Sequence, residues 1–507
     1  MENLPKSNKF KNNKKIKLSL TFGYSCIDFW IKKILFLVIL IQLIACSDEE
    51  LFFEDAIVIE NIGVIDPIDG LEQNMTVIIK ENKILDIYKT KEAIVSAKNK
   101  IYNGSNKFLI PGLWDAHIHF AFEKDFATSM PDLFLYHGIT SLRDTGGEFD
   151  FVNKFKQEAI SNPKIKSRVK IAGPLIDGKF NVYDGNNSYY PKLSIQNINN
   201  EQLEKNVKIL IDKGVDFLKA YEMLSPDQFK KLSNLAKKNN LKLTGHIPLS
   251  MDVIEASNLG LNSIEHLRNI ELSMTSQSEE LFKERKTLLK NKSSIKGSKL
   301  RSLIHSKQRM KSINDLDSMK IDNVIDVIIK NDVWQIPTLI LYKNFANKTF
   351  KNSDYLPFLN LLPGQKKEEW IKKINTIDSE INQQVVDYTV WSKKMVGYMH
   401  DKGISFMAGT DTPIGFLIPG LSLHQEIQEL HESGLSELEA IQAATINPAK
   451  YFNLENSLGR IKPGFIADLI ILDKNPLENI SNTKSIQAVI KEGNLMNRSY
   501  LDSLLIK

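Results

Sequence analysis

Two histidines separated by one residue, His117 and His119, constrain this chain more than any other feature of its sequence. They lie in the run LIPGLWDAHIHF, where an apolar approach with a Pro-Gly break leads into a buried strand. Side chains two residues apart on a strand point to the same face, so one metal ion can bind both imidazoles. The same spacing also arises in exposed strands and by chance, and the pair alone leaves these alternatives open.

Composition describes a large globular protein and excludes little else. The chain has 507 residues, of which 42% are hydrophobic and 25% charged, as in ordinary domains with a sizeable core. The net charge of +5 comes from residues 1–45, which contain eight lysines against Glu2 and Asp28. The remainder is close to neutral, so the charge gives no indication of nucleic-acid binding.

The N-terminal leader predicts export. Lys32-Lys33 precede an apolar run, Ile34 to Ala45, that is too short for a spanning helix and typical of a signal peptide. The next residue completes Leu43-Ile44-Ala45-Cys46, which resembles the lipobox of bacterial lipoproteins. We expect residues 1–45 to be a signal peptide or leader, Cys46 to be lipidated, and residues 46–55 to be an acidic tether. The mature protein would be an exported, membrane-anchored lipoprotein on the periplasmic face or cell surface. An ordinary signal peptide with an incidental cysteine is the alternative.

The pattern of apolar residues predicts an α/β fold. Short strand-like runs occur at both ends of the mature chain, and strand-like runs alternate with amphipathic helical stretches between them. Eight such runs suit a (β/α)₈ TIM barrel: 113–119, 139–143, 169–172, 217–221, 241–246, 263–266, 334–339 and 404–410. We expect a barrel over residues 111–454 with a helical insertion at about 270–330. Residues 56–110 and 455–507 would form a small β-sandwich domain built from both chain ends.

Metal-compatible side chains end five of these predicted strands, where barrel active sites are built. They are His117 with His119, Lys219, His246, His266 and Asp411. An inward lysine in an apolar strand is costly unless it is paired or modified. Each residue alone has a structural explanation, but six such groups at five strand ends indicate a metal site.

With the strings around them, these residues resemble the amidohydrolase superfamily, in its imidazolonepropionase-like and prolidase-like branch of metal-dependent hydrolases. The strings are LIPGLWDAHIHF, GITSLRDTGG, GVDFLKAYE, TGHIPLS, SIEHL, MAGTDTP and AATINPAKYFNLENSLGRIKPGFIADLIILDKNPL. The resemblance spans roughly residues 55–505 and implies the barrel and the two-ended β-sandwich expected above.

The resemblance also implies a binuclear metal centre. It assigns His117, His119 and Asp411 to one divalent ion, His246 and His266 to the other, and Lys219, carbamylated by CO₂, to both. Imidazole and carboxylate ligands suit Zn²⁺, with Mn²⁺, Fe²⁺ and Co²⁺ as alternatives.

The implied reaction is hydrolysis of C–N bonds in small amides, dipeptides or cyclic amides by a metal-bound hydroxide. Asp411 would act as the catalytic residue that takes the proton of the water and passes it to the leaving group. Tyr221 and Arg268 are candidate substrate-binding residues; a packed barrel tyrosine and an external salt bridge are their structural alternatives.

Two other functions remain open at this point: a lactonase or phosphotriesterase-type hydrolase with the same site, and a surface lipoprotein that binds a ligand without catalysis. After Lys219 the sequence AYEMLSP departs from the loop common in prolidase-like relatives, which weakens dipeptide cleavage as a specific assignment. A homo-oligomer is compatible with any of these functions.

Several polar residues have structural interpretations. We expect Arg143 and Asp144 to form an ion pair, and the segment 180–190 to supply an aromatic pocket wall. His424 is a candidate for a supporting role near the metals. The remaining histidines are expected at the surface: His137, His305, His400 and His431.

Overall fold

The computed structural model describes residues 50–53, 55–90, 94–97, 100–187, 189–290 and 295–505. The predicted signal peptide at residues 1–45 and the predicted lipidation site Cys46 lie outside the described residues, as do residues 47–49 and 54 of the tether. Within the described part of the chain, every helix is too short or too polar to cross a membrane. The fold is mixed α/β, as the alternating pattern predicts.

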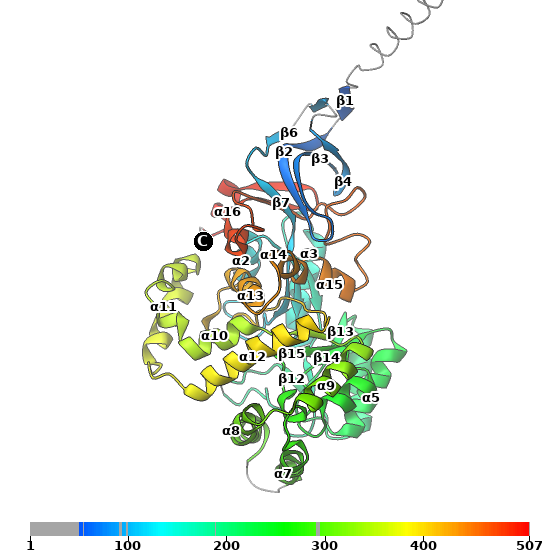
Figure 1. Ribbon diagram of the computed structural model, residues 1–507, viewed down its shortest axis with the longest axis vertical. Coiled ribbons are helices and arrows are strands. Elements are labelled where there is room, and N and C mark those ends of the chain that lie inside the picture. The colour runs from blue at the N-terminus through cyan, green and yellow to red at the C-terminus, as the bar shows by residue number, and fades with distance from the viewer. Residues whose placement is uncertain are drawn as a thin grey trace, which may run out of the picture.

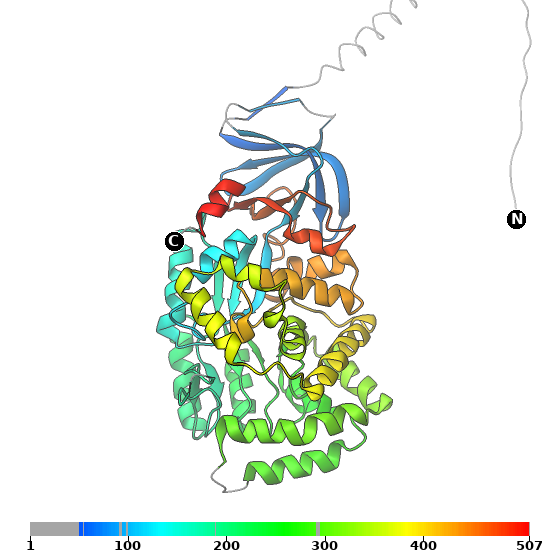
Figure 2. The same cartoon turned by 90° about the vertical axis from the view of Figure 1, so that its left-hand side faces the viewer.

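A sheet at one end of the molecule draws its strands from both ends of the chain (Figures 1 and 2). The order of its hydrogen-bonded strands is β19 (Asn494–Asn497), β18 (Ile486–Lys491), β17 (Leu469–Leu472), β7 (Phe108–Pro111), β2 (Ala56–Asp66), β3 (Gly70–Lys80) and β4 (Lys83–Lys89). A further strand, β6 (Lys100–Asn103), pairs with β2. Buried residues of early and late strands, such as Leu109 and Ile471, share one apolar cluster. The two segments predicted to form one domain therefore meet in this sheet. A separate pair joins β1 (Glu50–Phe53) to β5 (Ile94–Ala97).

The strands that lead to the predicted ligands pair in parallel. One sheet contains β8 (Leu113–Ile118), β9 (Ile139–Asp144) and β10 (Arg168–Ile171). The other contains, in order, β12 (Ser194–Gln196), β11 (Leu175–Asp177), β13 (Phe217–Ala220), β14 (Lys242–Gly245), β15 (Ser263–Glu265) and β16 (Trp334–Ile336).

Backbone hydrogen bonds join these two sheets on both sides. On one side, Asp216 N donates to Ile171 O at 2.9 Å, next to β10 and β13. On the other side, residues 404–410 were predicted to form the eighth strand. They do not form a continuous strand, because they make only an isolated bridge, between Phe406 and Gln335. Even so, Met407 N donates to Gln335 O (3.0 Å) and Thr410 N donates to His117 O (3.2 Å). This segment therefore connects β16 back to β8.

Helices follow most of the parallel strands, and their sequences explain where they begin and which face is buried. In α5 (Pro226–Lys238), Ser225 and Gln228 form a capping box and Pro226 occupies the first turn. Phe229, Leu232 and Ala236 recur at helical spacing and are buried. The other helices of this part are α2 (Met130–Tyr136), α3 (Phe149–Ser161), α4 (Asn200–Asp212), α6 (Val253–Leu259), α10 (Leu339–Asn347), α11 (Gly364–Thr376), α12 (Gln383–Asp401), α13 (Leu421–Glu432), α14 (Glu437–Ala443) and α15 (Ile446–Tyr451). A last helix, α16 (Arg498–Ser503), follows β19.

The segment predicted as a helical insertion contains α7 (Ser278–Lys290), α8 (Gly297–Asn314) and α9 (Ser318–Lys330). The helices α7 and α8 lie at the end of the molecule opposite the two-ended sheet (Figure 1). Helix α8 packs against α12. Its buried residues, Ile304, Gln308 and Ser312, are spaced four apart and lie on one face.

Candidate metal centre

Three side chains converge where β8 meets the 404–411 segment. The Nε2 atoms of His117 and His119 each lie 3.2 Å from Asp411 Oδ1, and one ligand atom from each of the three residues lies within 4.8 Å of the others. Asp411 N donates to His117 O at 2.7 Å. The neighbouring Gly409 permits this close approach, since a Cβ there would lie 2.7 Å from His117 Cβ. Backbone packing thus brings together His117 and Asp411, which are 294 positions apart in the sequence.

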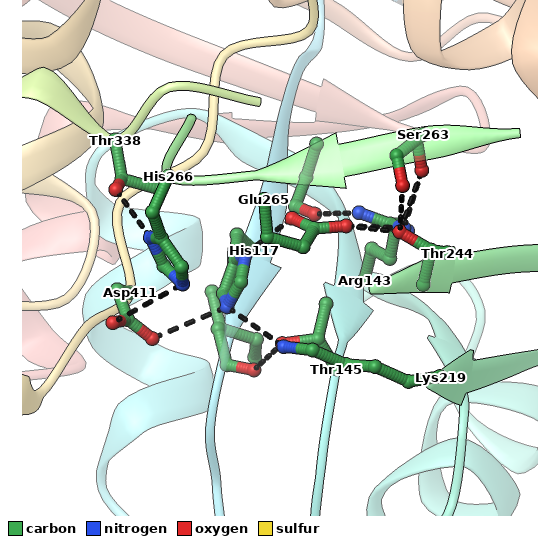
Figure 3. Close-up of polar contacts among 12 residues, drawn as sticks. His117, Arg143, Thr145, Lys219, Thr244, Ser263, Glu265, His266, Thr338 and Asp411 are labelled. Atoms are coloured by element: carbon green, nitrogen blue, oxygen red, sulfur yellow. Dashed lines mark hydrogen bonds and ion pairs between the residues drawn. The ribbon is translucent and has the colours of Figure 1, made fainter. Parts of the chain in front are cut away.

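His246 and His266 complete a cluster of four histidines. The centroid of the His266 ring lies 5.0 Å from that of His246 and 4.6 Å from that of His117. His266 Nε2 lies 3.8 Å from Asp411 Oδ2 (Figure 3). All four histidines are buried. The structure therefore places the four predicted histidine ligands and Asp411 in one site.

Each of these histidines uses Nδ1 for a hydrogen bond within the protein. The partners of His117, His119, His246 and His266 are, in that order, the Glu265 carboxylate (2.5 Å), the Gly146 carbonyl (2.9 Å), the Glu222 carboxylate (2.7 Å) and the Thr338 hydroxyl (2.6 Å). A carbonyl or carboxylate acceptor requires a proton on Nδ1, which leaves the lone pair on Nε2. This is the tautomer that a metal ion binds, and such partners also fix the orientation of the ring.

Lys219 of β13 is 1% exposed and points into the same cluster. Its Nζ lies 3.3 Å from His117 Nε2 (Figure 3). Burial lowers the pKa of this amine to about 8, against the opposing charges of Glu265 and Asp411. Within the described chain, no carboxylate lies within ion-pair distance of Nζ. The neutral amine is therefore accessible close to physiological pH.

The other titratable groups of the cluster have the charges that suit metal ligands. Burial would raise the pKa of Asp411, but the imidazoles of His266 and His117 hold it well below its ordinary value. Burial lowers the pKa of His246 to about 3 despite its bond to Glu222, and it also lowers the pKa of His266. At neutral pH the site therefore presents an ionised Asp411 carboxylate and neutral imidazoles at His246 and His266.

The residues present fit a divalent metal centre. His246 Nε2 and Asp411 Oδ1 are buried and have no hydrogen-bond partner among the described residues. Buried polar atoms rarely remain without a partner, so two such atoms in one cluster point to a missing ligand. Imidazole nitrogens and a carboxylate are the donors that Zn²⁺ and similar ions prefer.

Both predicted substrate-binding residues line the cavity above this cluster, which has a volume of about 30 Å³. The Tyr221 ring lies 4.5 Å from that of His246, and Arg268 reaches the cavity from beyond the end of β15. Tyr183 also lines it, so the segment 180–190 contributes an aromatic wall as expected. A further lining residue, Arg301 of α8, was not identified from the sequence.

The predicted ion pair between Arg143 and Asp144 is wrong. Successive residues of a strand point to opposite faces, and Arg143 Nη2 instead contacts Glu265 Oε1 at 2.9 Å. Asp144 accepts hydrogen bonds from the backbone N–H groups of Phe120 (2.9 Å) and Gly146 (3.1 Å). Glu265 thus connects two buried partners, His117 and Arg143 (Figure 3). The sequence alone offered no signal for this role.

The surface position predicted for His305 is also wrong. The insertion helix α8 turns this residue inward, where His305 Nε2 lies 3.3 Å from Glu222 Oε2 and 3.1 Å from Asn269 Oδ1. His137 is likewise buried. Its carbonyl oxygen lies 3.0 Å from His424 Nε2. His424 contacts Thr483 rather than the metal cluster. His400 and His431 are partly exposed.

Comparison with known proteins agrees with this geometry. The model of the Amidohydrolase family matches residues 367–496, which include Asp411. This match supports an assignment to the amidohydrolase superfamily. The chain is 22% identical over 490 residues to the ochratoxinase of Aspergillus niger, covering 85% of each chain. It is 33% identical over 105 residues to an adenine deaminase of Clostridium botulinum, but the match covers only 16% of that protein and 21% of this one.

Solved structures resemble the chain over most of its length. A Xaa-Pro dipeptidase with methionine in its active site gives a TM-score of 0.63 at 19% identity, covering 87% of this chain and all of the other. The ochratoxinase of A. niger gives a TM-score of 0.59 at 17% identity, covering 87% of this chain and 96% of the other. At these identities the likeness concerns the fold.

Proposed function

We propose that the chain is a binuclear, metal-dependent amidohydrolase that cleaves C–N bonds of small amides, dipeptides or cyclic amides. The observation that supports this most is the convergence of six buried groups: His117, His119, Lys219, His246, His266 and Asp411. The match to the Amidohydrolase family model at residues 367–496 agrees with amide hydrolysis, and the choice among these amides is part of the proposal.

The architecture that we propose is a (β/α)₈ barrel over residues 111–454 with a β-sandwich from residues 56–110 and 455–507. The parallel pairing of β8 to β16 and the return through residues 404–411 support the barrel. The barrel would place the six groups at the carboxyl ends of its strands, where (β/α)₈ enzymes have their active sites.

In the proposed centre, His117, His119 and Asp411 hold one ion and His246 and His266 the other. Zn²⁺ is our first choice, with Mn²⁺, Fe²⁺ and Co²⁺ as alternatives. When bound, such ions lower the pKa of a water molecule and polarise a carbonyl group.

Lys219 is proposed to bridge the two positions as a carbamate. Its buried amine lies 3.3 Å from His117 Nε2. Attack of the neutral amine on CO₂ forms an N–C bond and releases one proton. The product is an anionic group with two oxygen donors, which a lysine amine alone does not offer.

Asp411 is proposed to transfer the proton during hydrolysis. It is ionised, buried, and has an Oδ1 without a hydrogen-bond partner among the described residues. It therefore accepts a proton from the attacking water and returns it to the departing nitrogen. Tyr221 and Arg268 line the cavity from which the substrate approaches.

Metal analysis combined with a substrate panel tests this proposal. We expect two divalent ions per chain, and turnover of an amide from a panel of a dipeptide, an N-acyl amino acid and a lactone. Dialysis against a chelator should abolish turnover and re-addition of Zn²⁺ should restore it, because the proposed attacking hydroxide would form only on a bound ion. Fewer than two ions per chain contradicts the binuclear centre. Full occupancy with turnover of the lactone alone, or of no compound, would favour the lactonase or the binding protein instead.

We also propose that the protein is an exported lipoprotein anchored to a membrane through Cys46. The supporting observation is the sequence Leu43-Ile44-Ala45-Cys46 after a short apolar run. In bacterial cells expressing the full chain, labelled palmitate should enter the protein, and Cys46→Ser should abolish labelling. Cys26→Ser, at the other cysteine of the chain, is the matched control. Labelling that survives Cys46→Ser contradicts the anchor.

A further inference from the structure

A second, larger cavity lies beside the candidate metal centre, where α8, α10 and α12 meet (Figure 1). It opens to solvent and has a volume of about 410 Å³. Arg268 lines both this cavity and the one above the metal centre. Tyr342, on its wall, donates from its hydroxyl to the carbonyl of His266 at 2.9 Å. The two cavities are therefore neighbours on either side of Arg268.

The wall of this second cavity contains buried polar atoms that lack partners. Arg309 Nε and Nη2, Arg268 Nε and Tyr388 Oη are buried and make no hydrogen bond among the described residues. The Arg309 guanidinium lies 4.2 Å from the centroid of the Tyr388 ring, within the range of a cation–π contact. Buried donors without acceptors are costly, so several of them around one cavity indicate an acceptor that binds there.

The charges around the cavity indicate that the acceptor is an anion. Arg268, Arg301 and Arg309 face two carboxylates. Of these, Glu222 already contacts His246 Nδ1 (2.7 Å) and Arg301 Nε (3.0 Å). The nearest approach of the other, Glu271, to Arg309 is 3.7 Å. Three partly buried guanidinium groups against two carboxylates leave one positive charge without compensation, which is unfavourable in a partly desolvated site.

The rest of the wall is aromatic. Tyr342, Phe345 and Tyr388 line the cavity, and the Tyr342 and Tyr388 rings lie 5.2 Å apart. Rings of this kind bind a large flat or apolar group by stacking and by excluding water. A planar guanidinium beside them pairs with a carboxylate through two parallel hydrogen bonds.

We propose that this cavity is the subsite for a substrate arm in which a carboxylate is attached to an aromatic or similarly bulky apolar group. Arg268 and Arg309 bind the carboxylate, and the three aromatic residues pack against the apolar group. This inference rests on the proposed function, since it places the amide of the same substrate at the metal centre. It narrows the substrates to amides that carry a carboxylate on an aromatic or similarly bulky apolar arm.

Binding of uncleavable ligands to chelator-treated protein tests the subsite. By titration calorimetry we expect 3-phenylpropanoate to bind at least tenfold more tightly than the neutral 3-phenylpropan-1-ol. Arg309→Gln should remove this preference, whereas Lys307→Gln, which removes a charge from the exposed face of the same helix, should leave it unchanged. Arg309→Lys keeps the charge without the planar fork and should recover only part of the preference.

Each outcome is informative. Equal affinity for the acid and the alcohol, or an Arg309→Gln protein that still prefers the acid, overturns the proposal. Tighter binding of phenyl phosphate than of 3-phenylpropanoate overturns the assignment to a carboxylate. The comparison of acid and alcohol in the unaltered protein needs no variant, so misfolding of Arg309→Gln cannot mask the result. Because no metal and no turnover are involved, failure of this test is distinguishable from failure of the proposed hydrolysis.

Discussion

Asp411→Asn is expected to lower the rate of amide hydrolysis by about 10³-fold or more while leaving the fold intact. Loss of a group that transfers a proton in the transition state costs about 10²- to 10⁴-fold. Asp411 is also a proposed metal ligand. Its pKa lies well below the ordinary value because the imidazoles of His266 and His117 oppose the effect of burial. Asparagine keeps the shape of the side chain but offers neither the charge nor a basic oxygen.

The measurement is kcat for the amide that the panel identifies, together with thermal unfolding and metal content. Asp401→Asn, the same exchange at the exposed end of α12, is the matched control and should retain full activity. An Asp411→Asn enzyme with more than a tenth of the original rate would contradict the proposed role in proton transfer.

Lys219→Ala is expected to reduce the metal content from two ions per chain to one or none and to abolish hydrolysis. The side chain is buried against His117, and within the described chain its amine has no carboxylate partner. In our proposal its carbamate is the only group that contacts both ions. Alanine removes that bridge and leaves a void beside His117.

Metal analysis after dialysis in metal-containing buffer measures the loss, and addition of a small carboxylate such as acetate should restore part of both metal content and activity. Lys238→Ala, on the exposed end of α5, is the control. In the unaltered protein, labelled bicarbonate should give a carbamate signal by carbon NMR, which Lys219→Ala should remove. Two ions per chain in Lys219→Ala would exclude a bridging role for this residue.

The sequence predicts best what depends on local pattern. The strand-like runs that carry a predicted histidine or lysine ligand correspond closely to β8, β13, β14 and β15, because apolar alternation and turn residues determine both the strand and its end. The last predicted run, at 404–410, differs. Its backbone forms hydrogen bonds with Gln335 and His117, but it does not pair with either strand over a continuous stretch. The contacts that define it come from β8 and β16, which lie far away in the sequence.

Pairing between distant residues was not predictable from one sequence. Glu265 contacts His117 across 148 positions, and Arg143 contacts Glu265 across 122. Nothing in the runs that contain them distinguishes these partners from Asp144. The sequence also contains no indication that Arg301, His305 and Arg309 turn inward. They lie in a lysine-rich helix whose composition is typical of a solvated surface. Packing of α8 against α12 turns part of that helix toward the two cavities.

The two-ended sheet has a consequence for the order of events in synthesis. The strand β7, which leads directly into β8 and its two histidines, pairs with β17 on one side and with β2 on the other. A ribosome must therefore translate beyond residue 472 before β7 acquires both neighbours. We expect nascent chains to lack an assembled site until nearly the whole polypeptide exists. Cells thus have an interval in which each copy is still unfinished and its candidate metal-ligating side chains are not yet together.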